Sequence, residues 1–252
     1  YAKDQGGADN WGLVKKIVAS DRDENDQFGY SVSISGNYAI VGSRYADEDA
    51  SGANTMNMAG AAYIFFKDMG GIDNWGEVKK IVASDRDDVD VFGASVSISG
   101  DYAIVGAPFE DEDASGANTM SSAGSAYIFY KNMGGTDNWG EVKKITASDR
   151  DDEDRFGYSV AISGTYAVVG AYYEDEDALG ANTMSSAGSA YIFSKDMGGT
   201  DNWGEVKKIT ASDRYYGDCF GHSVAISGNN IIAGAYYDDW GWGSAYIFAK
   251  DQ

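Results

Sequence analysis

An internal repeat constrains the fold of this 252-residue chain more than any other feature. Large aromatic residues recur every 64 positions, and only the last tyrosine of the series arrives nine residues early. The period is carried by Trp11, Trp75, Trp139 and Trp203, by Phe28, Phe92, Phe156 and Phe220, and by Tyr63, Tyr127, Tyr191 and Tyr246. Because a fixed period of this length marks a repeated supersecondary unit, we expect residues 1–252 to form one domain of four units, the last one shortened.

Each unit contains four runs with the composition of β-strands. In the second unit these runs are 92–99, 102–106, 125–130 and 139–148, and the pair Gly100-Asp101 suits a two-residue hairpin turn. No segment shows a helical period. Four strands in each of four units predict an all-β fold, a four-bladed β-propeller of four-stranded blades. A solenoid is the alternative.

The order of strands along the chain predicts how the propeller closes. The chain opens with a strand-like run at Trp11–Ser20 and closes with the third strand of a unit at Gly243–Phe248. We expect residues 11–20 to complete the last blade and close the ring. The Lys pairs of this run, such as Lys79-Lys80, mark it as the outermost strand, since lysine protects exposed sheet edges. The chain begins YAKDQ and ends FAKDQ, which leaves a larger array open.

Composition excludes several function classes. The net charge of −21 argues against nucleic acids and anionic membranes as partners and favours cations. No run reaches 18 apolar residues, so no membrane insertion is expected. The chain has one cysteine, Cys219, and one histidine, His222, and their spacing puts them on opposite faces of an extended strand. We therefore expect no enzyme, because no nucleophile and base stand together.

The first acidic loop of each unit has the ligand spacing of a calcium loop. Asp47, Asp49 and Ser51 are followed by Gly52, which matches D-x-D-x-S-G, and Met58 in place of Glu excludes an EF-hand. Hard oxygen donors favour Ca²⁺ over transition metals. The corresponding candidates in the next units are Asp111, Asp113 and Ser115, and then Asp175 and Asp177.

A second acidic loop, D-R-D-x-x-D, precedes each Phe-Gly pair and is the second choice for a metal. The alternative for both loops is a solvated acidic surface with local arginine pairing. The second-choice ligands are Asp21, Asp23 and Asp26; Asp85, Asp87 and Asp90; and Asp149, Asp151 and Asp154.

Aromatic residues suggest a second kind of site. Most recur at a fixed register, which indicates packing between blades. Tyr30, Tyr158 and His222 occupy one varying position of the innermost strand and could face the central channel. Trp240 and Trp242 lie in a short acidic loop where the last unit has lost residues. These five are weak candidates for ligand binding, with packing as the alternative.

The second unit spells Phe92-Gly93 and then Gly106-Ala107-Pro108, and so resembles the FG-GAP repeats that form the propeller at the head of integrin alpha subunits. The closer likeness is to the bacterial-type variant, and it covers nearly the whole chain. The resemblance implies calcium bound in loops of the D-x-D-x-D-G type, which adds Thr55 and Thr119 to the ligands. Here the acidic loop lies between the second and third strands, whereas in integrins it lies between the first two.

These observations lead to a functional expectation. We expect a secreted or cell-surface, non-enzymatic binding or adhesion module with calcium-stabilised loops, whose ligand is an unidentified protein or glycan. A carbohydrate-binding lectin with aromatic pockets is the alternative. A structural acidic surface protein is the second alternative.

Overall fold

The structure is a computed structural model that describes residue 8 and residues 10–250. The described residues form four antiparallel sheets and one short helix, α1 (Asp238–Gly241). The all-β prediction is therefore confirmed. The end YAKDQ and the last two residues of FAKDQ lie outside the described residues.

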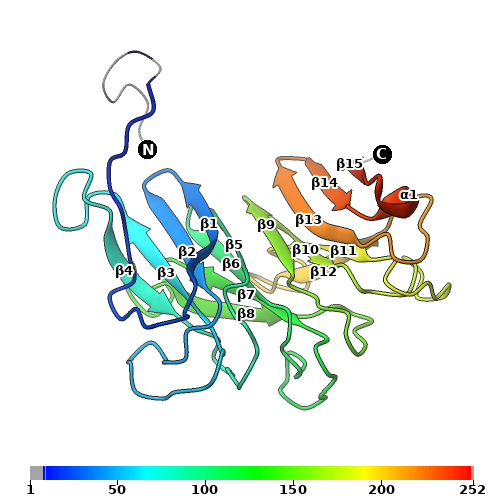
Figure 1. Cartoon of the computed structure of the whole chain (residues 1–252), viewed down its shortest axis with the longest axis horizontal. Coiled ribbons are helices and arrows are strands. Elements are labelled where there is room, and N and C mark those ends of the chain that lie inside the picture. The colour runs from blue at the N-terminus through cyan, green and yellow to red at the C-terminus, as the bar shows by residue number, and fades with distance from the viewer. Residues whose placement is uncertain (1–7, 9, 251–252) are drawn as a thin grey trace.

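Each of the first three units forms a four-stranded blade whose strands follow chain order across the sheet. The last unit forms a blade of three strands. Figure 1 shows the first and last blades at opposite ends of an open row. The blades are β1 (Phe28–Ser35), β2 (Tyr38–Ser43), β3 (Ala61–Phe66) and β4 (Gly76–Ile81); β5 (Ser95–Ser99), β6 (Tyr102–Ala107), β7 (Ser125–Tyr130) and β8 (Gly140–Ile145); β9 (Ser159–Ser163), β10 (Tyr166–Ala171), β11 (Ser189–Ser194) and β12 (Gly204–Ile209); and β13 (Phe220–Ser227), β14 (Asn230–Ala235) and β15 (Ser244–Ala249).

The hydrophobic core lies between blades. Val96 and Ile98 of β5 share one cluster with Ile40 of β2 and Ile64 of β3 in the preceding blade. Alternate residues of each strand therefore face the neighbouring blade, as the two-residue period of the first strand predicts. The same arrangement recurs between the second and third blades.

The glycines of the repeated motif allow two blades to approach closely. A Cβ atom on Gly42, in β2, would lie 2.1 Å from the carbonyl oxygen of Gly93 in the next blade. Gly93 itself has a φ of +89°. Ser31 Oγ donates a hydrogen bond of 2.8 Å to the same Gly93 carbonyl. Only glycine fits at this contact, since any side chain would overlap the opposing backbone.

The outermost strand of each blade also contacts the preceding blade. Trp139, just before β8, is buried and packs edge-on against Tyr38 of the first blade, with ring centroids 5.4 Å apart. The Lys pairs lie on these outermost strands, as predicted, but the second lysine is buried. Lys144 Nζ lies 2.7 Å from Asp85 Oδ2, so this lysine forms an ion pair inside the blade in addition to any protection of the edge.

Residues 11–20 contact the first blade and do not pair with β15 among the described strands. Lys15 Nζ donates a 2.8 Å hydrogen bond to Asn74, and Ser20 Oγ donates one of 2.9 Å to Glu77. The segment thus lies against the first blade, while β15 pairs with β14 alone among the described strands. These contacts repeat those of β4 on the second blade, where Ser84 bonds to Glu141, so the segment takes the place of an outermost strand of a preceding blade. The four-blade arrangement is observed, and the closed ring stays a prediction.

Candidate functional site

The four units differ from one another at three positions that the fold brings together at one end of the innermost strands. The first position comes directly before the Phe-Gly pair and the second directly after it. The third comes directly after β2 or the equivalent strand of each blade. We call the set the variable rim, and it comprises Gln27, Tyr30 and Arg44; Val91, Ala94 and Pro108; Arg155, Tyr158 and Tyr172; and Cys219, His222 and Tyr236.

A strained turn holds the rim residues in place. Gln27, Val91, Arg155 and Cys219 all have φ between 56° and 60°, a left-handed conformation that is unfavourable for residues with a side chain. The Tyr30 amide donates to the Gln27 carbonyl and closes the turn. Backbone strain of this kind gathers at functional sites, where the surrounding structure maintains it.

The first blade contributes an arginine between two tyrosines. The Arg44 guanidinium lies 3.7 Å from the centre of the Tyr30 ring and 4.5 Å from that of Tyr45. Arg44 Nε donates to Gln27 Oε1 at 2.8 Å, which fixes the plane of the guanidinium. Tyr30 is about half exposed, so one face of this stack is available to a ligand.

Arg155 plays the corresponding role in the third blade and joins it to the second. Its guanidinium donates to the Tyr172 hydroxyl at 2.9 Å. It also lies 4.8 Å from the Phe109 ring centre and 4.7 Å from that of Tyr173. Glu153 is its carboxylate neighbour, at 3.4 Å. Two blades therefore share one arginine at the rim.

His222 joins the rim of the fourth blade to that of the third. Its ring centroid is 4.9 Å from that of Tyr158 and 4.5 Å from that of Tyr236. Burial lowers the pKa of His222, so the imidazole is neutral at pH 7 and stacks without charge. Burial raises the pKa of the Cys219 thiol, whose hydrogen-bond partner is Tyr236. Stacking, rather than nucleophilic chemistry, is what this arrangement supports.

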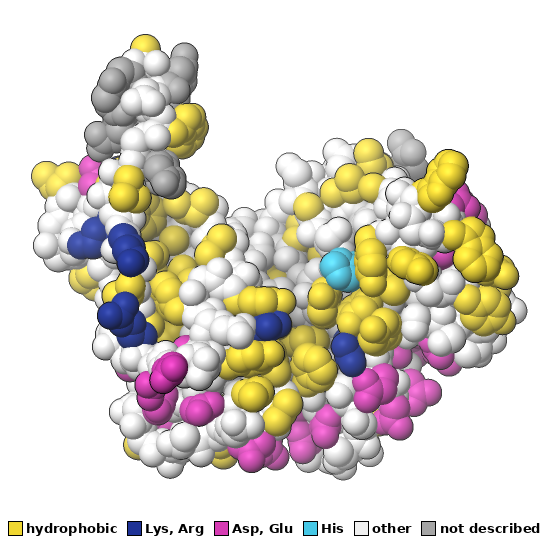
Figure 2. All heavy atoms as spheres, in the orientation of Figure 1, with side chains coloured by type: hydrophobic (Ala, Val, Ile, Leu, Met, Phe, Trp, Pro, Cys, Tyr) yellow, Lys and Arg dark blue, Asp and Glu magenta, His cyan; other side chains and the backbone are white. Residues whose placement is uncertain are grey.

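Figure 2 shows hydrophobic side chains gathered across the middle of the face that carries the single histidine, with dark-blue basic side chains between them. Acidic side chains follow the lower margin of the same face. Of the three rim candidates, Tyr158 and His222 are in ring contact, and Tyr30 occupies the same position in the first blade. Arg44, Arg155, Tyr172 and Tyr236 were missed, although their variation between otherwise similar units was a usable signal.

The other two aromatic candidates lie elsewhere. Trp240 and Trp242 are both strongly exposed, and Trp240 lies 6.3 Å from Tyr215 between ring centroids. Asp239 and Trp240 have positive φ values inside the short helix α1. These residues form a second exposed aromatic group beside the last blade and are not part of the rim.

A model of the FG-GAP repeat matches this chain four times, at residues 11–65, 75–129, 139–193 and 203–248. The matches cover most of the chain and coincide with the four units. The chain belongs to the FG-GAP repeat family. A search of curated proteins finds no match. No helix in the described part of this FG-GAP chain is long and apolar enough to cross a membrane.

In the first acidic loops of the FG-GAP units, the aspartate side chains accept hydrogen bonds from the same loop. Asp49 Oδ1 accepts hydrogen bonds from the amide and hydroxyl of Ser51 and from the Ala53 amide. These donors lower the pKa of Asp49 well below its usual range. Asp47 Oδ1 accepts from the Met58 amide, and Thr55 forms a backbone bridge with Glu48. Donors thus occupy one carboxylate oxygen of Asp47 and both of Asp49.

The next two units repeat these bonds. Asp113 accepts from Ser115, and Asp111 accepts from the Ser122 amide. In the third unit Asp175 accepts from the Ser186 amide and Asp177 from the Leu179 amide. In the second unit Thr119 forms a backbone bridge with Glu112. In the part of the chain that the structure describes, no three acidic, histidine or cysteine side chains gather as a metal site would require. The calcium site therefore stays a prediction.

The aspartates of the second acidic loops also accept hydrogen bonds from other residues of the chain. Their first aspartates bind the buried lysines and the recurring tyrosines, as in the contacts of Asp21 with Lys80 and Tyr63. Their last aspartates accept a backbone amide within the loop. The loop contacts join Asp23 to Asp26, Asp87 to Asp90 and Asp151 to Asp154, and the lysine contacts join Asp85 to Lys144 and Asp149 to Lys208.

Buried carboxyl groups beside these loops were not anticipated. Glu110 is fully buried, accepts from the Tyr127 hydroxyl at 2.5 Å and lies 3.2 Å from Lys144 Nζ. Burial raises the pKa of Glu110 to about 7, and burial together with Glu110 raises the pKa of Asp90 to about 8. Glu174 repeats the contacts in the third unit. Their lysine and tyrosine partners assign them to the blade interior.

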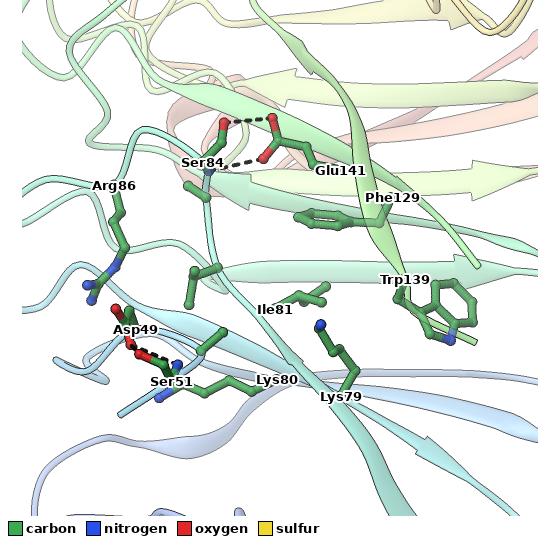
Figure 3. A pocket seen from close by; sticks show the side chains of 13 residues that line it. Asp49, Ser51, Lys79, Lys80, Ile81, Ser84, Arg86, Phe129, Trp139 and Glu141 are labelled. Carbon is green, nitrogen blue, oxygen red and sulfur yellow. Dashed lines mark hydrogen bonds between the residues drawn. The ribbon is translucent and has the colours of Figure 1, made fainter. Parts of the chain in front are cut away.

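A groove of about 480 Å³ lies between β4 and the second blade. In Figure 3 Asp49, Ser51 and Arg86 lie on one side of it and Trp139 on the other, with Ser84 bonded to Glu141 above. A groove of the same volume lies between residues 15–22 and the first blade. Because the groove recurs with the repeat, it belongs to the architecture, and the rim remains the surface at which the units differ.

Proposed function

We propose that this FG-GAP chain is a non-enzymatic binding module of the extracellular space or cell surface, and that its ligand contacts the variable rim. The observation that supports this most is the placement of the positions that differ between units. The repeated positions pack between blades, whereas the rim residues that are exposed or half-buried form a surface of stacked aromatic and arginine side chains. These residues are Tyr30, Arg44, Arg155, Tyr158, His222 and Tyr236. Exposed positions of this kind can vary to suit a ligand, since the packed positions between blades leave little freedom.

The chemistry of the rim indicates the ligand. Tyrosine rings offer flat apolar faces together with hydroxyl groups, and Arg44 and Arg155 offer planar hydrogen-bond donors in a chain of net charge −21. A ligand that presents a flat apolar face and an acidic group satisfies both. An acidic segment of another protein meets these requirements and fits an adhesion module.

Carbohydrate binding is the second candidate function. The half-exposed rings of Tyr30 and Tyr236 favour it, because sugar rings stack on aromatic faces. The two candidates differ in what they need from the rim. A protein ligand with carboxylates depends on both arginines, whereas a neutral sugar depends on the rings alone.

Binding to printed arrays of acidic peptides and of neutral and acidic glycans tests the proposal. Tyr236→Ala removes a rim ring, and Tyr215→Ala removes an equally exposed tyrosine beside Trp240, both being 53% exposed. We expect binding by the unmodified chain, its loss in Tyr236→Ala and its retention in Tyr215→Ala. The reverse pattern would transfer the site to the Trp240 group. No binding to any array would favour a structural acidic surface protein.

A further inference from the structure

Both ends of the row of blades expose apolar residues whose equivalents are buried inside it. In the first blade Val32 and Ile34 are 68% and 65% exposed, whereas Val96 and Ile98 at the same positions of the second blade are 8% and 4% exposed. In the last blade Ile247 is 75% exposed, although its equivalents in the first two blades are fully buried. Each end therefore carries half of an interface.

The two halves are complementary because the units are repeats. Inside the row, Ile40 and Ile64 of one blade pack against Val96 and Ile98 of the next. In the last blade, Ile232 and Ile247 are the equivalents of Ile40 and Ile64. In the first blade, Val32 and Ile34 are the equivalents of Val96 and Ile98. The last blade of one molecule thus matches the first blade of another.

The glycines at the two ends support the same interface. A Cβ atom on Gly93 would lie 2.4 Å from the Ala61 carbonyl of the preceding blade, whereas one on Gly29 would meet nothing within 4 Å. Gly234 corresponds to Gly42, yet a Cβ there would meet only its own neighbour Ser223. Both end positions keep the glycine that a close approach of two backbones needs.

Residues 11–20 match the outermost strand that the last blade does not have in the described part of the chain. Beside β15 lies a groove of about 340 Å³ lined by Tyr166 and Ile231. Its counterpart between the second and third blades holds the buried Trp203, whose ring centroid lies 5.5 Å from that of Tyr102. Trp11 is the equivalent tryptophan and is mostly exposed. The fourth blade therefore has a place for the tryptophan that begins this segment.

Charge complementarity points to the same pairing. In the interior blades a buried lysine of the outermost strand bonds to the first aspartate of the second acidic loop, as Lys144 does to Asp85. The matching residues are Lys16 in the segment and Asp213 beside the last blade. Asp213 already accepts from Tyr246, as Asp85 does from Tyr127, and so is held in the same orientation.

We propose that a second copy of this chain docks head to tail, with its first blade and residues 11–20 covering the last blade of its neighbour. The segment is held on its own first blade in the place that an outermost strand of a preceding blade takes. The last blade of the same chain stands at the other end of the row (Figure 1). The matching exposed residues at the two ends favour a second copy as the occupant of this place, and such contacts form rings when the rotation closes.

Light scattering during gel filtration of the full chain tests this assembly. The expected mass is at least twice the 26.9 kDa of one chain. Ile34→Asp places a charge on the exposed apolar face of the first blade and should prevent docking there. Ile247→Asp does the same on the last blade. Ile72→Asp is the matched control, because Ile72 is 91% exposed in the β3–β4 loop. The control should keep the mass of the unmodified chain.

A mixing experiment separates contact between copies from closure of one chain. Each interface variant alone should have the mass of one chain. Mixed in equal amounts they should form a species of two chains, because the intact last blade of Ile34→Asp meets the intact first blade of Ile247→Asp. A single-chain mass for the unmodified protein would overturn the proposal. So would a mixture that does not associate.

Discussion

Trp139 allows the packing between blades to be tested with a worked magnitude. The side chain is 1% exposed and lies in the cluster shared by the first and second blades. Replacing a buried tryptophan by alanine removes its contacts and leaves a cavity, at a cost of about 3–5 kcal/mol. In a domain of this size each kcal/mol lowers the melting temperature by about 2–4 °C. Trp139→Ala should therefore melt about 6–20 °C lower than the unmodified chain.

Thermal unfolding followed by circular dichroism measures this change. Trp240→Ala is the control, because Trp240 is exposed and makes one distant ring contact. Exposed substitutions stay within about 0.5 kcal/mol, so the control should melt within about 2 °C of the unmodified chain. A shift in Trp139→Ala as small as the control's would refute the assignment of the core to the spaces between blades.

Three further predictions concern the acidic loops. Burial raises the pKa of Asp90 and of Asp154 to about 8, from 3.8, so the stability they contribute is complete below about pH 4 and is lost as the pH rises through 8. The free energy of unfolding, measured in urea, should fall between about pH 4 and pH 8. The double variant Asp90→Asn, Asp154→Asn should show a smaller fall over the same range. Arg86→Ala removes two hydrogen bonds to carbonyls of the first acidic loop and should speed amide exchange in residues 47–58. If calcium binds that loop, millimolar Ca²⁺ should raise the melting temperature, and Asp47→Ala with Asp111→Ala should abolish the response; an equal shift with Mg²⁺ would indicate charge screening.

The repeat made the fold predictable, because each strand run and each turn glycine recurs at the same register. The hairpin at Gly100 has the expected two-residue turn, with Ser99 paired to Tyr102. The resemblance carried by Phe92-Gly93 was confirmed by the family match. What the motif does physically, a backbone contact between Gly93 and Gly42, became visible only once two blades were placed together.

The parts that escaped prediction depend on contacts between units. Arg155 reaches Phe109 of the preceding blade, and nothing in the local sequence around either residue indicates that contact. Glu110 was not singled out from the sequence, and it is buried because Lys144 and Tyr127 bind its carboxylate from neighbouring strands. Local patterns define strands and turns, whereas the rim and the buried carboxyls arise from tertiary packing.

The binding surface is tested most directly by transferring the rim of one unit to another. Arg155→Val, Tyr158→Ala and Tyr172→Pro together give the third blade the residues that the second blade already carries. Because Tyr172 is buried, the exchange should lower the melting temperature, and circular dichroism checks that the exchanged chain is still folded at the temperature of the binding assay. The affinity for the strongest array ligand is then measured by calorimetry, with Leu179→Ser as the control exchange. We predict loss of binding in the rim exchange alone, and unchanged affinity would contradict the assignment of function to the rim.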